Sequence, residues 1–132
     1  MENLRIGQSA SIERSFTKED VIAFTKLSMD TNPEQLDEEY AKTTVFKDNI
    51  VHGFLVGSLI SAVIGTMLPG PGSIYLHQEM DFRRPVYIGE SVKATVTVES
   101  IRTDKPIIRL STKCMNDRHE EVIDGFAVIK IQ

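Results

Sequence analysis

The sequence predicts an α+β protein in which a curved antiparallel sheet wraps around one central apolar helix. Three features predict this class. Helix-forming patterns fill the first half of the chain, and residues 73–132 contain four segments rich in β-branched residues. Between them, residues 54–68 are apolar on nearly every side. A helix of that kind must be enclosed, and the predicted sheet is the only cover available for it.

The N-terminal part is expected to form one short strand and then a helix. Residues 10–16 alternate in polarity enough for a strand. Thr17 is expected to cap the following helix, whose acidic first turn is favoured by the helix dipole. Three apolar residues at helical spacing predict its buried stripe: Val21, Phe24 and Leu27.

Asn32 and Pro33 predict the start of a second, short helix. Asn32 suits the N-cap, and proline at the first helical position loses no hydrogen bond. This helix is expected over residues 34–43, and a loop then leads to Gly53 and the apolar helix. The prolines and glycines of residues 68–72 are expected to end that helix.

The second half of the chain predicts four long strands joined by short turns. Alternation of polarity is clearest from Val92 to Val98, where every second residue is apolar. The turns are too short for crossover connections, so the strands are expected to be antiparallel. The four predicted strands are residues 73–82, 90–102, 106–116 and 121–132.

Composition limits the kinds of partner. With 132 residues, the chain is expected to form a single domain over residues 1–132. Its net charge is −4, and no run of basic residues is longer than the pair Arg83 and Arg84. That pattern predicts neither nucleic-acid binding nor binding to an anionic membrane.

The cysteine and histidine content predicts a cytoplasmic protein without a metal site. The single Cys114 excludes an internal disulfide and fits a reducing compartment. The first residues lack the apolar core of a secretory signal, and residues 54–68 are too short for a membrane span. The three histidines, His52, His77 and His119, share no metal-ligand spacing.

Two residues are candidates for chemistry, and each has a structural alternative. Gly53 begins the apolar helix, so the unpaired N–H groups there could stabilise an anion or a polarised carbonyl oxygen. Alternatively, Gly53 has only a structural role and allows the chain to turn tightly into the helix. Asp30 could be a reactive carboxylate, or it could hydrogen-bond the turn around Asn32. His52 could serve the site or fix the loop by a hydrogen bond.

Taken together, these motifs resemble one family. The motif Asp-x-Asn-Pro at residues 30–33, Ile-Val-His-Gly at residues 50–53, the serine- and glycine-bearing helix and FRRPVYIGESV at residues 82–92 carry the likeness. The sequence resembles the MaoC-like hydratases, most closely their single-domain (R)-specific enoyl-CoA hydratases. The resemblance implies the hot-dog fold and a role in fatty acid metabolism. The implied reaction is hydration of a trans-2-enoyl-CoA, with no cofactor beyond the coenzyme A of the substrate.

The resemblance also implies roles for individual residues. The catalytic aspartate of the family corresponds to Asp30, and the glycine whose N–H binds the thioester carbonyl corresponds to Gly53. A supporting serine on the central helix corresponds to Ser61. The catalytic histidine of the family corresponds to Gln35. Glutamine cannot act as a general acid or base, but its amide can hold a water molecule.

Three functions remain open on the sequence alone. The first is a hydratase in which Asp30 works with Gln35. The second is a non-catalytic acyl-CoA-binding protein, which Gln35 favours. The third is an acyl-CoA thioesterase, which is disfavoured because residues 54–68 contain no carboxylate.

Further contacts follow from the resemblance. Four residues are the candidate substrate-binding residues: Asn32, His52, Ser61 and Arg84. Arginine suits the phosphates of coenzyme A, although a solvated turn would also explain Arg84. The family resemblance also implies a homodimer or larger homo-oligomer with sheets joined edge to edge.

Overall fold

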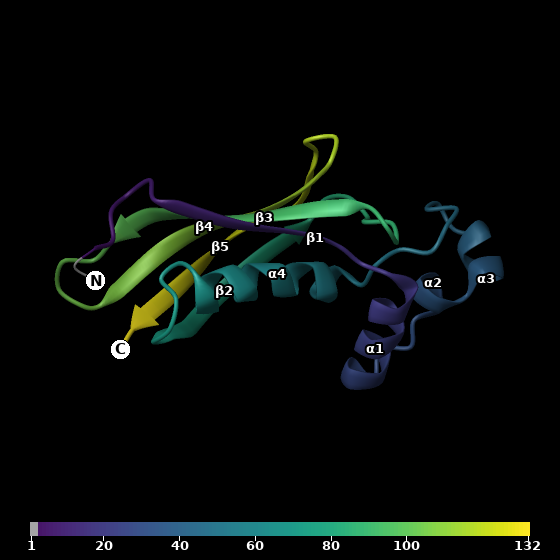
Figure 1. Cartoon of the computed structure of the whole chain (residues 1–132), viewed down its shortest axis with the longest axis horizontal. Coiled ribbons are helices and arrows are strands. Elements are labelled where there is room, and N and C mark those ends of the chain that lie inside the picture. Colours follow the sequence, from purple (N-terminus) through teal and green to yellow (C-terminus); the bar gives the residue numbers. More distant parts are fainter. Residues whose placement is uncertain (1–2) are drawn as a thin grey trace.

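The computed structural model describes residues 3–132, in which five strands form a single sheet. One helix lies along this sheet, and three shorter helices gather near one end of it (Figure 1). The strand order in the sheet is β1-β3-β4-β5-β2, and all neighbouring strands are antiparallel. The elements are β1 (Ser9–Ser15), α1 (Lys18–Ser28), α2 (Pro33–Leu36), α3 (Glu38–Lys42), α4 (Gly53–Thr66), β2 (Ser73–Phe82), β3 (Ser91–Ile101), β4 (Ile107–Asn116) and β5 (Glu121–Ile131). The predicted α+β class and the antiparallel pairing are confirmed.

The alternation predicted for β3 selects the face of the sheet that is buried. Val92, Ala94, Val96 and Val98 are all buried, and they stand opposite alternate residues of β4. Val98 pairs with Leu110, for example. Because neighbouring side chains of a strand point to opposite faces, one apolar set lines the core and the polar set faces outward.

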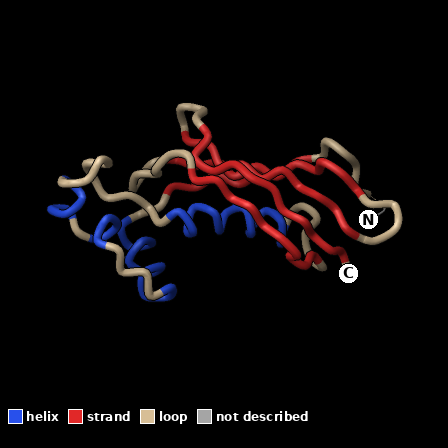
Figure 2. The backbone as a smooth tube through the Cα atoms, turned by 180° about the vertical axis from the view of Figure 1, so that it is seen from behind, coloured by secondary structure: helices blue, strands red, loops and turns tan. Residues whose placement is uncertain are grey.

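Helix α4 lies along the inner face of the sheet (Figures 1 and 2). Its buried side chains pack into the core against β3 and β4: Val56, Leu59, Ile60, Val63 and Ile64. Each such side chain contributes about 1.5–3 kcal/mol through burial. The opposite face, including Phe54, Ser58 and Ser61, is exposed. Full enclosure of the helix was therefore a wrong expectation for this chain, because one sheet covers only one side.

Helix α1 begins as predicted but buries a different set of residues. Thr17 Oγ1 accepts a hydrogen bond from Asp20 N at 3.1 Å, and the Asp20 carboxylate accepts one from Thr17 N at 2.9 Å. This capping box also lowers the pKa of Asp20, chiefly through the Thr17 N–H. Val21 is buried, whereas Leu27 is 85% exposed. Leu27 does not join the expected buried stripe, because α1 extends beyond the end of the sheet (Figure 1).

The single short helix predicted for residues 34–43 is two helices, α2 and α3, separated at Asp37. This residue is extended, with φ −106° and ψ 107°. Its N–H donates to Pro33 O at 2.9 Å, and its side chain accepts a hydrogen bond from Tyr40 N at 3.0 Å. Asp37 therefore ends one helix and caps the next.

Candidate active site

Gln35 is held beside the entrance to α4. Asn32 caps α2 through its side-chain oxygen, which accepts from Glu34 N at 3.1 Å. The carbonyl oxygen of Glu34 accepts from the Asn49 side chain at 2.8 Å and from Ile50 N at 3.2 Å. Residues 49–50 lead into α4, so these bonds fix α2 against the start of that helix. The Asn32 side chain, predicted to bind substrate, is used as a cap here.

The Gln35 side chain presents a buried acceptor with no donor. Lys18 Nζ donates to the backbone oxygens of Gln35 and Leu36, at 3.2 Å each, which secures α2 from the side of α1. Gln35 is only 5% exposed, and its Oε1 has no hydrogen-bond partner among residues 3–132. A buried acceptor without a partner is energetically costly, so this oxygen suits a hydroxyl group or a water molecule.

Asp30 lies in the turn after α1. Its N–H donates to Ser28 Oγ at 3.1 Å, and its Oδ1 accepts from Asn32 N at 3.2 Å. The turn-forming interpretation is thus correct for Oδ1. Within the described chain Oδ2 makes no hydrogen bond, and the residue is exposed. One carboxylate oxygen therefore remains for a ligand.

His52 connects Asp30 to the start of α4. Its Nε2 lies 3.2 Å from the backbone oxygen of Asp30 and 3.5 Å from Thr25 Oγ1. The ring is 2% exposed and packs against the ring of Phe24, with 4.9 Å between centroids. Because Gly53 follows His52 directly, this contact links the turn that carries Asp30 to the start of α4.

Gly53 is the first residue of α4 and is packed against an aromatic ring. A Cβ at this position would lie 2.8 Å from Cε1 of Phe82. The carbonyl oxygen of His52 accepts from the N–H groups of Leu55 and Val56. The Gly53 N–H, two positions before Leu55, is among the unpaired donors at the positive end of the helix. Sequence reasoning missed Phe82, since nothing in its own segment indicates this contact.

A cavity of about 340 Å³ opens at the N-terminal end of α4. Gly53, Val56 and Phe82 line it, together with Arg84 and Val86 from the segment after β2. The lining is mostly apolar, which suits an acyl or thioester group more than a free anion.

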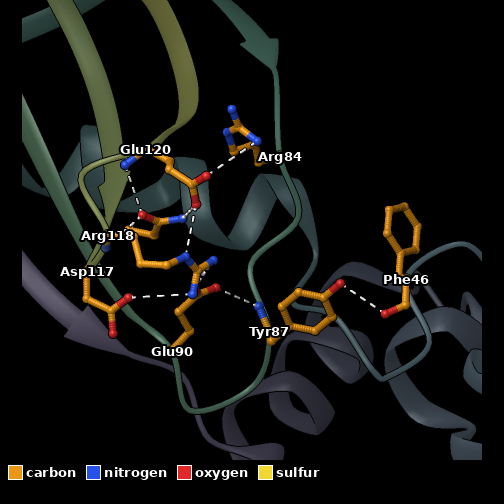
Figure 3. Close-up of polar contacts among 8 residues, drawn as sticks. Phe46, Arg84, Tyr87, Glu90, Asp117, Arg118 and Glu120 are labelled. Atoms are coloured by element: carbon orange, nitrogen blue, oxygen red, sulfur yellow. Dashed lines mark hydrogen bonds and ion pairs between the residues drawn. The ribbon is translucent and has the colours of Figure 1, made fainter.

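The loop on one side of this cavity is fastened to the loop before α4. Tyr87 Oη donates to Phe46 O at 2.9 Å (Figure 3). Val51 N also donates to Val86 O at 2.7 Å. These bonds fix the distance between the two loops, so the cavity does not depend on side-chain packing alone.

Arg84 lines the cavity but is already paired within the chain. Its Nη1 lies 3.6 Å from Glu120 Oε2, and Arg118 contacts both Glu120 and Glu90 (Figure 3). The pKa of Glu120 is lowered, first by the Asn116 side chain and then by Arg118. Arg84 is therefore a half-exposed member of an ion-pair network, and its contact with coenzyme A stays a prediction.

Ser61 lies on the exposed face of α4, about 12 Å along the helix axis from Gly53 at 1.5 Å per residue. It lines a second cavity of about 550 Å³ with Phe54 and Ser58. Phe24 lines the same cavity and packs against His52. The structure therefore connects Asp30 with His52, which directly precedes Gly53. Gly53 lines the first cavity and Ser61 the second, whereas Asp30 and Gln35 line neither of these two.

Other groups offer little competing chemistry. Burial raises the pKa of the Cys114 thiol to about 12, which makes it a poor nucleophile. Histidine, cysteine and carboxylate side chains of residues 3–132 form no cluster of three that could hold a metal ion. In that part of the chain no helix has both the length and the apolar character needed to span a membrane.

Comparison with known proteins gives consistent matches over nearly the whole chain. The family model described as MaoC like domain matches residues 4–119. The (R)-specific enoyl-CoA hydratase of Rhodospirillum rubrum is 45% identical, over 98% of this chain and 90% of that protein. The corresponding enzyme of Aeromonas caviae is 43% identical, over 98% and 97%. The solved structure of the (R)-hydratase from A. caviae involved in PHA biosynthesis superposes with a TM-score of 0.97 at 42% identity, covering 100% of both chains.

Proposed function

Because this chain belongs to the MaoC-like domain family, we propose that it is an (R)-specific enoyl-CoA hydratase. The substrate is a trans-2-enoyl-CoA thioester, and water adds to its β-carbon to give a 3-hydroxyacyl-CoA. The reverse dehydration uses the same groups. The observation that supports this function best is the contact between His52 and the Asp30 backbone carbonyl, because it joins the turn that carries Asp30 to the residue before Gly53. The proposal includes no cofactor beyond the coenzyme A of the substrate.

The start of α4 supplies the stabilising donor for the reaction. As water adds, negative charge develops on the thioester oxygen while an enolate forms. Gly53 begins α4 at the positive end of the helix and lines the mostly apolar cavity, so its N–H is the donor assigned to this oxygen. A fixed donor of this kind typically lowers the barrier by about 3–4 kcal/mol.

Asp30 and Gln35 activate and position the attacking water molecule. The free carboxylate oxygen of Asp30 takes a proton from the attacking water and returns a proton to the α-carbon. The Gln35 amide holds the water, with its buried Oε1 accepting one of the water hydrogens. Gln35 positions the nucleophile and moves no proton, so Asp30 is the only acid–base group in this scheme.

One observation favours a second function. A site with one acid–base group could bind an acyl-CoA thioester without converting it, and Gln35 is the feature that favours this. An acyl-CoA thioesterase is the weaker alternative, because α4 carries no carboxylate to attack the thioester.

A hydration assay separates these functions. Loss of the conjugated ultraviolet absorbance of crotonyl-CoA is measured with the unmodified protein, Asp30→Asn and Gln35→His. Removing the base should lower the rate by about 10²–10⁴-fold. Asp104→Asn is the matched control, because that exposed carboxylate pairs with Arg102 in the turn between β3 and β4.

The outcomes distinguish the alternatives. Turnover by the unmodified protein that depends on Asp30 supports the hydratase. Binding without turnover, together with activity gained in Gln35→His, would instead establish the binding protein. Release of free coenzyme A thiol from an acyl-CoA would identify a thioesterase.

The proposed assembly is a homodimer. β2 is an edge strand of the sheet, and large apolar side chains are exposed near it and around the site. Leu27, Met29, Val45 and Phe54 are each at least 68% exposed, and β2 itself exposes Tyr75, Leu76 and Phe82. An unpaired edge beside exposed apolar groups suits pairing with a second copy. Sedimentation equilibrium should give twice the chain mass of 14.8 kDa, and a monomer at all concentrations would refute this assembly.

A further inference from the structure

His52 makes the contact that ties the Asp30 turn to the rest of the molecule. The other hydrogen bonds of Asp30 are local, since Ser28 and Asn32 are each two residues away. The bond from the Asp30 carbonyl to His52 Nε2 spans 22 residues. Within residues 3–132, no other hydrogen bond of the 28–32 turn reaches a distant part of the chain.

The position of His52 explains why such a bond matters for the reaction. His52 is the N-cap residue of α4, but its side chain makes no capping bond. Its ring instead turns away from the helix toward α1, where it packs against Phe24 and lies 3.5 Å from Thr25 Oγ1. The main chain of His52 sets the position of Gly53, while its ring holds Asp30. One residue therefore joins the backbone of the Asp30 turn to the helix N-terminus.

The chemistry of the contact determines which ring nitrogen carries the hydrogen. The Asp30 carbonyl can only accept, so Nε2 must be the donor. In the neutral ring Nδ1 is then an acceptor, and Nδ1 is buried without a hydrogen-bond partner among the described residues. The Nε2–H tautomer is thus the form compatible with the observed geometry.

We propose that His52 is a positioning residue, which sets Asp30 relative to the Gly53 N–H through its Nε2–H bond to the Asp30 carbonyl. This inference rests on the proposed hydratase function. Both groups must grip the same small substrate, and a misplacement of about 1 Å can reduce a rate by about 10²-fold. His52 itself exchanges no proton with the substrate.

Two amide variants test the proposal with matched chemistry. In His52→Gln the amide N–H₂ reaches about as far as Nε2, so the bond to Asp30 can be kept. In His52→Asn the same amide is one methylene shorter and cannot reach. We expect His52→Asn to lower kcat by about 10- to 100-fold with little change in KM. His52→Gln should recover most of kcat, and His77→Asn, at an exposed histidine, should change neither constant.

A spectroscopic measurement tests the contact without relying on turnover. Long-range ¹H–¹⁵N correlation of the unmodified protein should show the Nε2–H tautomer for His52, assigned by its absence in His52→Gln. Thermal unfolding of each variant confirms that it is folded. An Nδ1–H tautomer would overturn the proposal, as would a folded His52→Asn variant with unchanged kcat. If the unmodified protein shows no turnover, the hydratase function fails, and the tautomer still decides whether His52 holds Asp30.

Discussion

Replacing Gly53 with alanine tests why a glycine begins α4. The new Cβ would lie 2.8 Å and 2.9 Å from two carbons of the Phe82 ring, closer than the 3.4 Å at which ordinary contact begins. Phe82 is 51% exposed, so its ring can swing outward. A forced rotamer change costs about 0.5–1.5 kcal/mol. Alanine is the better helix former by up to about 1 kcal/mol, which offsets part of that cost.

We therefore expect Gly53→Ala to lower the free energy of unfolding by no more than about 1 kcal/mol, an estimate that combines these two terms. The effect on activity should be larger. The thioester oxygen must approach the Gly53 N–H to about 3 Å, and a methyl group beside that N–H narrows the approach. We expect kcat/KM for crotonyl-CoA to fall by about 10-fold or more.

A double-mutant cycle with Phe82→Ala separates the two reasons for the glycine. Removing the ring relieves the clash, so the stability cost of Gly53→Ala should disappear in the Phe82→Ala background. The loss of activity should persist there. Urea unfolding measures the free energy of unfolding, and the absorbance assay measures activity. Both are applied to the unmodified protein, the two single variants and the double variant. If Gly53→Ala has no effect on activity once Phe82 is removed, then the glycine serves the ring alone and the oxyanion role is wrong.

Three further predictions concern stability and reactivity. Gly125→Ala should unfold the protein or lower its stability by more than about 3 kcal/mol, because the new Cβ would lie 1.9 Å from the Glu79 backbone oxygen on the paired strand. Urea unfolding measures this loss, and a stable variant would contradict the pairing of β2 with β5. Cys114 should react with a thiol reagent at pH 8 only on unfolding, because burial raises its pKa to about 12; rapid labelling of the native protein would count against it. The pKa of Glu120 is lowered in the folded chain, chiefly by Asn116, so its stabilising effect should be present at neutral pH and disappear as the pH falls through that lowered pKa. Thermal unfolding of Glu120→Gln should accordingly differ from the parent at pH 7 and converge with it in acid, and a constant difference at all pH values would refute the linkage.

The sequence predicted the sheet well because alternation reports directly on burial. The residues from Val92 to Val98 needed no knowledge of the remaining fold, since a strand's period of two decides which side chains face the core. The cap at Thr17 was also predictable, because it depends only on residues within one turn. Features that depend on a few neighbouring residues can be inferred from the sequence.

Features that depend on distant packing were predicted less well. Helical spacing placed Leu27 in the buried stripe, but spacing cannot show that α1 extends beyond the sheet. The break at Asp37 had a local signal, an aspartate followed by two glutamates, which is typical of a new N-cap. The strand order, with β2 beside β5 rather than β3, could not be derived from the turns.

The candidate site was predictable in its parts but not in its connections. Asp30, Gln35 and Gly53 came from motifs and from a family resemblance. The contact between His52 and the Asp30 carbonyl depends on how α1 packs against the start of α4, and the packing of Phe82 on Gly53 joins two segments 29 residues apart. Such contacts become visible only once the chain is folded.

The single aspartate shared by two short helices has a mechanical consequence. The Asp37 N–H makes the last hydrogen bond of α2, and its carboxylate caps the N-terminus of α3. Fraying of one helix therefore also removes a capping interaction from the other. Amide exchange in the two helices should therefore be correlated, and Gln35 would experience each opening event. A substitution at Asp37 would therefore weaken both helices at once, and it would disturb the position proposed for Gln35 without changing Asp30 itself.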